Sequence, residues 1–281
     1  MLRLKDLTLV ESRGALSRIP AGKVLINTIN AHSYNTAQKD ALFAEALTNG
    51  GYLIPDGASI VKACRWLKAK SRPEERIAGW DLFEFEMGRE NEERRMKNEE
   101  SNSYEAHTAS SEPDGSSLTQ EDSLFNKGNL SLKKKVMFMG SSEKVLSLIR
   151  KRMGEVYPQW DVVTYSPPYK PEFSEEDNDA IIKAVNDADP DLLWIGMTAP
   201  KQEKWAYCNW DRLDIHCHVG TIGAVFDFFA GTYKRAPQWW QDHSLEWLYR
   251  LLSEPRRMWR RYLIGNVLFL WNIWKERNSQ S

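Results

Sequence analysis

The sequence is short of the features that mark secreted, disulfide-bonded and membrane-spanning proteins. It has three cysteines among 281 residues, and no two of them form a CxxC pair. Such a small, odd number argues against a disulfide framework and favours a reducing, cytoplasmic environment. The N-terminal stretch lacks the apolar segment of a secretory signal. The longest mostly apolar run, 262–274, is shorter than the roughly 20 residues of a membrane-spanning helix. We therefore expect a protein that is soluble or peripheral at a membrane.

The chain also lacks a large net charge, which is −1 overall. No general field therefore draws the molecule to nucleic acid or lipid. The charge is unevenly placed, however: 84–122 is acidic on balance, whereas 250–261 holds five arginines and one glutamate. Eight of the twelve tryptophans follow residue 204. Because tryptophan favours sites that are apolar at one end and wet at the other, the C-terminal part is where a partner surface is expected.

Short apolar runs alternate with helical patterns along most of the chain. The runs are rich in β-branched residues and bounded by turn residues, which is typical of buried strands. Six strands are predicted, at residues 23–29, 52–54, 136–139, 160–165, 192–197 and 215–219. Helical patterns lie between them, the first predicted as one helix over 34–48. This order predicts an α/β fold, a doubly wound and mostly parallel sheet with helices on its faces.

Composition divides the chain further. Residues 1–237 are predicted to form the α/β core, and 238–281 a basic and aromatic helical appendage. Within the core, 89–132 is rich in Glu, Asn, Ser and Lys and poor in β-branched and aromatic residues. A segment of that kind does not bury enough surface to fold, so a disordered insertion is predicted. A regulatory segment is the alternative.

Candidate site residues follow several of the predicted strands. Ligands of such sheets bind at the carboxyl ends of the strands. Thr28 and Asn30 lie at the end of the first strand, and Asp56 lies in the turn after the second. Gly140 opens a small-residue turn before a helix, which is either a phosphate cradle or a simple turn.

Asp56 is the carboxylate with the strongest claim to chemistry. It precedes Gly57, which allows a ligand to approach the backbone closely. In the functional interpretation, Asp56 is a general base that removes a proton from an attacking hydroxyl. In the structural interpretation, it is a turn or N-cap residue of the helix from 58, and the pattern alone favours this role.

Further polar and glycine positions follow the last two predicted strands. Lys201 and Gln202 come after Pro200, where they either meet a phosphate and a sugar or simply open a helix. Gly223 and Asp227 lie in a glycine-spaced segment that indicates either a close ligand or close helix packing. His216 and His218 share one side of a strand, but no third residue has metal-ligand spacing, so no metal site is predicted.

The C-terminal arginines are interleaved with aromatic residues. Arginine pairs well with phosphate and diphosphate, and tryptophan with leucine makes an interfacial helix. The five arginines are Arg250, Arg256, Arg257, Arg260 and Arg261. The alternatives are a basic helix packed on the core, an oligomer interface and a groove for RNA. RNA is disfavoured because the basic charge is confined to this segment and no RNA-binding motif is present.

Several motifs together resemble one family. The chain is similar to the WecG/TagA/CpsF family of bacterial glycosyltransferases in the motifs Thr28-Ile-Asn30, Pro55-Asp56-Gly57, Arg76-Ile-Ala-Gly79-Trp-Asp81, Pro200-Lys-Gln-Glu203, Phe226-Asp227, Lys234-Arg235-Ala236-Pro237, Leu245-Glu-Trp-Leu-Tyr-Arg250 and Glu254-Pro-Arg-Arg257. The resemblance covers nearly everything outside 89–132. Ser59 and Ser141 depart from it, standing where the family usually has glycine.

The resemblance implies a reaction. A sugar, typically of N-acetylmannosamine type, would move from a UDP-sugar to an undecaprenyl-diphosphate-linked acceptor at the inner face of the membrane, in surface polysaccharide synthesis. The implied enzyme is inverting and metal-independent, needs no cofactor, and has a Rossmann-like core with a C-terminal membrane-docking appendage. Asp56 would be the base, with Thr28 and Asn30 as the pocket floor. Arg76 and Gln202 would contact ligands, and the five appendage arginines would bind the lipid diphosphate.

The competing hypothesis is a non-catalytic protein on the same fold that binds a nucleotide or a lipid diphosphate. A homo-oligomer is compatible with either hypothesis, and no nucleic-acid partner is expected.

Overall fold

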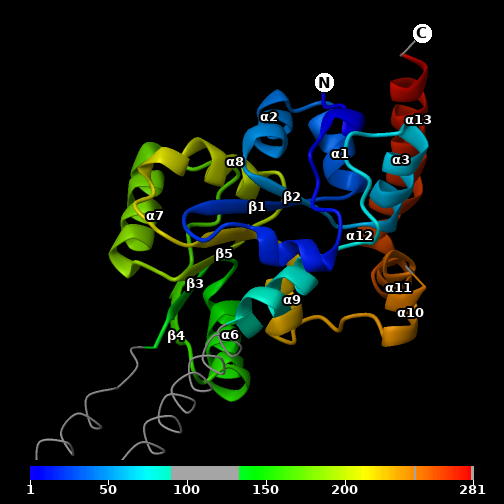
Figure 1. The fold of residues 1–281 in the computed structure, drawn as a ribbon. Coiled ribbons are helices and arrows are strands. Elements are labelled where there is room, and N and C mark those ends of the chain that lie inside the picture. The colour runs from blue at the N-terminus through cyan, green and yellow to red at the C-terminus, as the bar shows by residue number, and fades with distance from the viewer. Residues whose placement is uncertain (90–132, 244, 280–281) are drawn as a thin grey trace, which may run out of the picture.

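Six parallel strands form one sheet in this computed structural model, which describes residues 1–89, 133–243 and 245–279. The strand order is β2-β1-β6-β5-β3-β4. The bounds are β1 (Val24–Ile29), β2 (Tyr52–Pro55), β3 (Lys135–Gly140), β4 (Asp161–Tyr165), β5 (Leu192–Gly196) and β6 (His218–Thr221). The predicted parallel α/β sheet is confirmed (Figure 1). Apart from residue 89, the insertion predicted at 89–132 lies outside the described residues.

The first helical segment is two helices, so the single helix predicted over 34–48 is wrong. They are α1 (Ala31–Ala37) and α2 (Ala41–Asn49). The Asn30 side chain accepts hydrogen bonds from the first turn of α1, and the Asp40 side chain accepts one from the Phe43 N–H at 2.9 Å. Each cap satisfies backbone donors that a helix start leaves unpaired, so the chain starts a helix twice.

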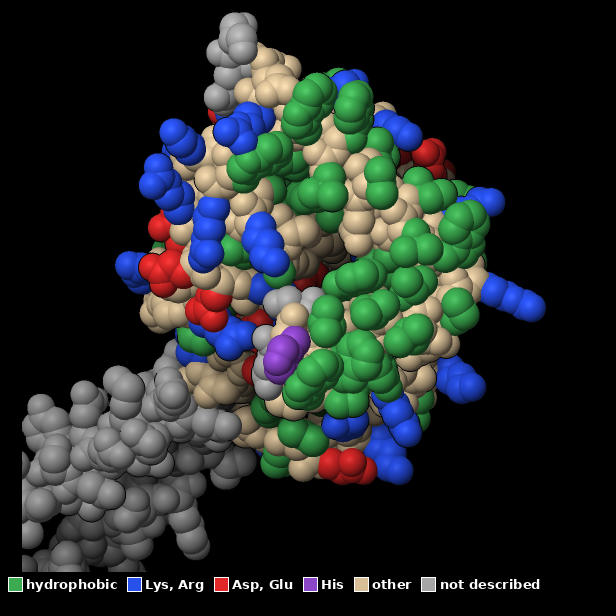
Figure 2. Space-filling model, turned by 90° about the vertical axis from the view of Figure 1, so that its right-hand side faces the viewer, with side chains coloured by type: hydrophobic (Ala, Val, Ile, Leu, Met, Phe, Trp, Pro, Cys, Tyr) green, Lys and Arg blue, Asp and Glu red, His purple; other side chains and the backbone are tan. Residues whose placement is uncertain are grey.

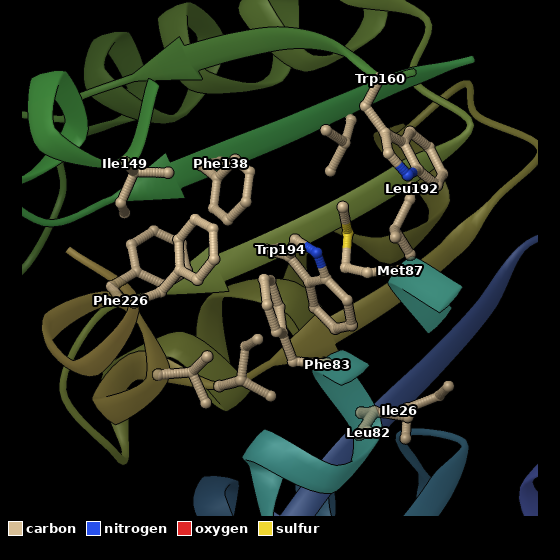
Figure 3. Close-up of a cluster of buried hydrophobic side chains, with 14 of the residues drawn as sticks. Ile26, Leu82, Phe83, Met87, Phe138, Ile149, Trp160, Leu192, Trp194 and Phe226 are labelled. Carbon is tan, nitrogen blue, oxygen red and sulfur yellow. The ribbon is translucent and has the colours of Figure 1, made fainter. Parts of the chain in front are cut away.

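Helices cover both faces of the sheet. On one face lie α7 (Glu175–Ala188) and α8 (Lys201–Cys208), and on the other lie α6 (Glu143–Val156), α9 (Gly223–Phe229) and a helix that begins at Gly79 (Figure 1). Along β3, Phe138 packs on one face and Met139 on the other, which explains why the strand is an unbroken apolar run. Trp194 and Phe83 belong to the cluster of buried side chains under α6 and α9, with their ring centroids 5.6 Å apart (Figure 3).

The C-terminal helices lie beside the sheet rather than apart from it. After α3 (Ala58–Leu67) and the core helices come α10 (Gln238–Asp242), α11 (Glu246–Ser253), α12 (Pro255–Trp259), a π-helical stretch (Arg260–Ile264) and α13 (Gly265–Asn278). Figure 1 shows α13 alongside α1 and α3. Phe269 and Ile273 of α13 are buried in one cluster with the N-terminal leucines. None of the described helices has the length and apolar character needed to cross a membrane. The boundary predicted after residue 237 stays a prediction.

A buried carboxylate attaches α13 to the N-terminal part of the chain. Glu276 accepts hydrogen bonds from the Leu4 N–H (3.1 Å), the Lys5 N–H (2.8 Å) and the Tyr34 hydroxyl (2.6 Å). Burial, together with the hydrogen bond to Glu276 and its negative charge, strongly raises the pKa of the Tyr34 hydroxyl. Tyr34 therefore acts as a neutral donor, and three donors from distant segments depend on this one acceptor.

We predict that Glu276→Gln destabilises the protein by about 2 kcal/mol or more, because a carboxamide turns one acceptor into a donor that faces other buried donors. The free energy of unfolding in urea measures the effect. Glu155→Gln, at an exposed position of α6, is the control and should change stability little. Equal unfolding midpoints for the two variants would contradict the role of Glu276.

Candidate functional site

The carboxyl ends of β1 and β2 bring two predicted site residues together. The register pairs Ile29 with Pro55, and the Asp56 N–H donates to the Ile29 carbonyl at 2.8 Å. Asn30 and Asp56 therefore follow neighbouring strands at the same edge of the sheet. Thr28 lies half-buried two residues before Asn30. Asn30 also caps α1, so its side-chain oxygen is already engaged by the His32 and Ser33 N–H groups.

The Asp56 carboxyl lies in a crowded place but keeps partial access to solvent. Burial raises the pKa of this carboxyl to about 6. Among nearby charges, Glu246 also raises it, and three arginines oppose the rise: Arg76, Arg250 and Arg261. Gly57 is the N-cap residue of α3, and no side chain caps that helix. Of the structural interpretation, a turn or N-cap residue, the N-cap role of Asp56 is therefore wrong.

Glu246 organises the arginines around Asp56. One of its oxygens lies 3.0 Å from Nη1 of Arg76, and the other lies 3.2 Å from Nη2 of Arg250. The Glu246 side chain is only 12% exposed. Burial acts to raise the pKa of this carboxyl, but the arginines outweigh it and hold the pKa below its ordinary value. Glu246 is thus charged and holds both guanidinium groups in place.

Sequence reasoning did not select Glu246. One signal for it was present, because Glu246 and Arg250 are four residues apart on a helix, the spacing of a stabilising ion pair. Its contact with Arg76 spans 170 positions and has no local signature.

Gln202 and Gly223 allow the chain after β5 and the chain after β6 to pack closely. The buried Gln202 side chain accepts from the Met197 N–H at 3.1 Å and donates to Glu203 at 2.9 Å. A Cβ atom on Gly223 would lie 2.2 Å from the Met197 carbonyl oxygen, so only glycine fits there. These contacts support close packing for this part of the glycine-spaced segment. Glu203 is also buried, which raises the pKa of its carboxyl to about 7.

The other predicted substrate contacts, Gly140, Lys201 and Asp227, have local contacts of their own. Gly140 has a φ of 120°, and a Cβ atom there would lie 2.4 Å from the Gly196 carbonyl oxygen. The Lys201 ammonium donates to the Lys170 carbonyl and lies 3.5 Å from the centroid of the Phe173 ring. Asp227 accepts hydrogen bonds from Thr232 through its backbone carbonyl and its carboxylate.

The five predicted lipid-diphosphate arginines separate into groups. The charges of Arg250 and Arg261 lower the pKa of Asp56, so these two arginines are part of the charge cluster around it. Arg250 also lies over the Phe228 ring, 4.7 Å from its centroid. Arg256 and Arg260 are exposed. The side chain of Arg257 lies outside what the structure describes.

The histidine pair is at the opposite edge of the sheet, where β6 begins. His218 is buried, with Nδ1 2.9 Å from Glu86 and Nε2 2.8 Å from the Pro20 carbonyl oxygen. Within residues 1–89, 133–243 and 245–279, no group of three His, Cys, Asp or Glu side chains is placed to hold a metal ion.

We predict that Glu246→Gln lowers the pKa of Asp56 below about 6. The change removes a negative charge that raises this pKa and leaves two arginines uncompensated. Carbon-13 NMR titration of the Asp56 carboxyl measures the shift. Glu175→Gln, on the exposed surface of α7, is the matched control. An unchanged or raised pKa would show that Glu246 does not control the ionisation of Asp56.

A carboxylate of raised pKa beside several arginines, at the carboxyl edge of a parallel sheet, is typical of an enzyme that acts on anionic substrates. The chain belongs to the WecG/TagA/CpsF family of glycosyl transferases, whose family model matches residues 2–97 and 117–281. The resemblance seen in the sequence motifs is confirmed.

Two curated relatives carry the same name, N-acetylglucosaminyldiphosphoundecaprenol N-acetyl-β-D-mannosaminyltransferase. The relative from Bacillus subtilis (strain 168) is 25% identical over 92% of this chain and 82% of its own length. The relative from Bacillus spizizenii (strain ATCC 23059 / NRRL B-14472 / W23) is 26% identical over 85% of this chain and 74% of its own.

Proposed function

We propose that this protein transfers a sugar of N-acetylmannosamine type from a UDP-sugar to an undecaprenyl-diphosphate-linked sugar in bacterial surface polysaccharide synthesis. The observation that carries the proposal is the Asp56 carboxyl, raised in pKa to about 6 and surrounded by arginines. Family membership and the names of the relatives support the reaction class.

The proposed chemistry is a single displacement with inversion. Asp56 takes the proton of the acceptor hydroxyl as the oxygen attacks the anomeric carbon of the donor. The bond between that carbon and the diphosphate oxygen breaks, and UDP leaves with the negative charge. A pKa of about 6 leaves Asp56 ionised at neutral pH and still basic enough to accept the proton.

The site arginines supply the positive charge that the leaving diphosphate needs. Arginine binds phosphate oxygens through two parallel N–H donors. Arg76 and Arg250 are already held by Glu246, so little of their side-chain freedom remains to be lost when a substrate binds. With these cations in place, the proposed mechanism needs no metal ion.

The C-terminal helices support docking at the inner face of the membrane. Figure 2 shows a hollow near the centre of one face, with a wide hydrophobic area on one side of it and charged side chains on the other. The exposed apolar residues of α11 to α13 are Leu252, Trp259, Leu263, Ile264, Val267, Leu270, Trp271 and Trp274. Tryptophan and leucine beside arginine and lysine suit the headgroup boundary of a bilayer. A docking appendage on a Rossmann-like core, peripheral on the cytoplasmic side, is therefore part of the proposal.

We predict that Asp56→Asn reduces sugar transfer by at least about a hundredfold, because the amide cannot accept the proton. Transfer of radiolabelled sugar to a lipid-linked acceptor measures the loss, and Asp211→Asn on the surface is the control. In the active wild type, the rate should rise with pH through about 6 as Asp56 ionises.

The Asp56→Asn variant should fold normally. The folded state raises the pKa of Asp56, so ionising this group costs stability as pH rises from its ordinary pKa through about 6. Removing the charge does not weaken the fold at neutral pH. Near wild-type transfer by a well-folded variant would show that Asp56 is not the base and would favour the non-catalytic hypothesis.

We predict that replacing Leu263, Val267 and Leu270 together by Gln removes binding to anionic vesicles. Val267 and Leu270 are 68% and 65% exposed, so the change takes apolar surface from the docking area without opening the core. Sedimentation with vesicles measures binding, and Leu148→Gln on α6 is the control. Unchanged sedimentation would contradict docking, and a change of size in gel filtration would reveal self-association through this area instead.

A further inference from the structure

A polar pocket of about 430 Å³ shares Arg76 with the charge cluster around Asp56. Its walls come from three stretches of the chain: the 3₁₀ helix Arg13–Arg18, residues 75–84 (the loop that holds Arg76 and the start of the helix at Gly79), and the stretch from Arg235 through α10. Its volume is in the range of about 300 to 1,000 Å³ that is usual for small-molecule sites. The proposed reaction assigns none of its residues except Arg76.

The chemistry of the pocket fits a hydroxyl-rich ligand rather than a diphosphate. All lining residues are charged or are glutamines. Arg13 is already neutralised within the wall, since it lies 3.3 Å from Asp81 and 3.7 Å from Glu75. Three arginines thus face three carboxylates, so the wall has no excess positive charge to attract an anion. Many donors and acceptors without net charge suit hydroxyl and amide groups, which a sugar carries.

Arg235 is the most available cation in this wall. The guanidinium lies 5.2 Å from the centroid of the Trp80 ring, and partial burial lowers the pKa of Arg235. In the described part of the chain, no carboxylate is within ion-pair distance of it. Gln241 donates to the Ala236 carbonyl at 2.6 Å, which fixes the backbone next to Arg235. The Arg235 guanidinium is planar and lies against the Trp80 ring, so its N–H donors have a fixed direction and suit the recognition of neighbouring hydroxyls.

The pocket adjoins the base through Arg76. This residue lines the pocket, and its Nη1 bonds Glu246, which acts on Asp56. Arg76 therefore joins the pocket to the charge cluster around Asp56, the group that takes the proton in the proposed reaction. Gln238 lines the pocket while the next residue on α10, Trp239, is 57% exposed. A ligand with a polar head and a lipid tail matches this change from polar pocket to apolar surface.

We propose that this pocket holds the sugar of the lipid-linked acceptor and that Arg235, with Gln238, selects it. The inference rests on the proposed transferase function and adds the subsite and its specificity residues. Arg76 lines the pocket and also bonds Glu246, so a change at Arg76 would affect both sugar binding and the charge around Asp56. Arg235 lines the pocket and is not among the charges that shift the pKa of Asp56, so a change there tests sugar binding alone.

Arg235→Met tests the proposal, because methionine keeps contact with Trp80 and removes every donor. Lys234→Met, at the exposed neighbouring position, is the matched control. Initial rates are measured against a water-soluble, short-chain N-acetylglucosaminyl-diphosphate lipid at saturating UDP-sugar. Loss of a charged hydrogen bond to the sugar should raise the acceptor KM about tenfold or more, with kcat and the donor KM within about twofold of wild type.

An unchanged acceptor KM would overturn the proposal, as would an equal rise in the donor KM. Should Arg235→Met fold poorly, Gln238→Ala at an exposed position of α10 gives the same test. Calorimetric binding of the acceptor analogue decides the question without turnover: weaker binding to the variant supports the subsite, and equal binding overturns it. Absence of transfer by the wild type would count against the proposed function alone.

Discussion

The carboxylate of Glu246 is the contact on which the arrangement of the site depends. Each of its oxygens holds one arginine, Arg76 from the loop before the helix at Gly79 and Arg250 from its own helix. Removing one partner of a buried, paired charge is far more costly than removing an exposed one, so this junction keeps the C-terminal helices at the sheet edge. The same negative charge also opposes the effect of the arginines on Asp56. One side chain therefore attaches the C-terminal helices and adds to the rise in the pKa of Asp56 that burial causes.

A second carboxylate fixes the far end of the C-terminal segment. Glu276 collects two backbone donors from the N-terminus and the hydroxyl of Tyr34 on α1. With α11 held at the sheet edge and α13 held on α1, the exposed apolar surface has a set position relative to Asp56. Under the proposed function, this geometry presents the site to an acceptor whose lipid tail stays in the membrane.

Much of the fold could be predicted because its signals are local. Apolar strand runs and helix patterns were enough for the six parallel strands. The break between α1 and α2 was missed because the capping by Asp40 was not recognised, although a short polar residue before a helical run is a local signal. At the site, Asn30 and Asp56 could be expected at one edge. The role of Asp56 could not be decided from its neighbours, because a turn aspartate and a base have the same local sequence.

By itself, the sequence determined the parallel α/β class, the edge at which Asn30 and Asp56 meet and the family, since each depends on residue order and short-range pattern. Only the tertiary structure decided which charges surround Asp56 and that Glu246 holds two of the arginines. It also decided that the Gln202 amide bonds Met197 and Glu203, and that Arg235 and Arg76 line one pocket. The physical reason is that pKa, ion pairing and pocket shape depend on distances between segments far apart in the chain.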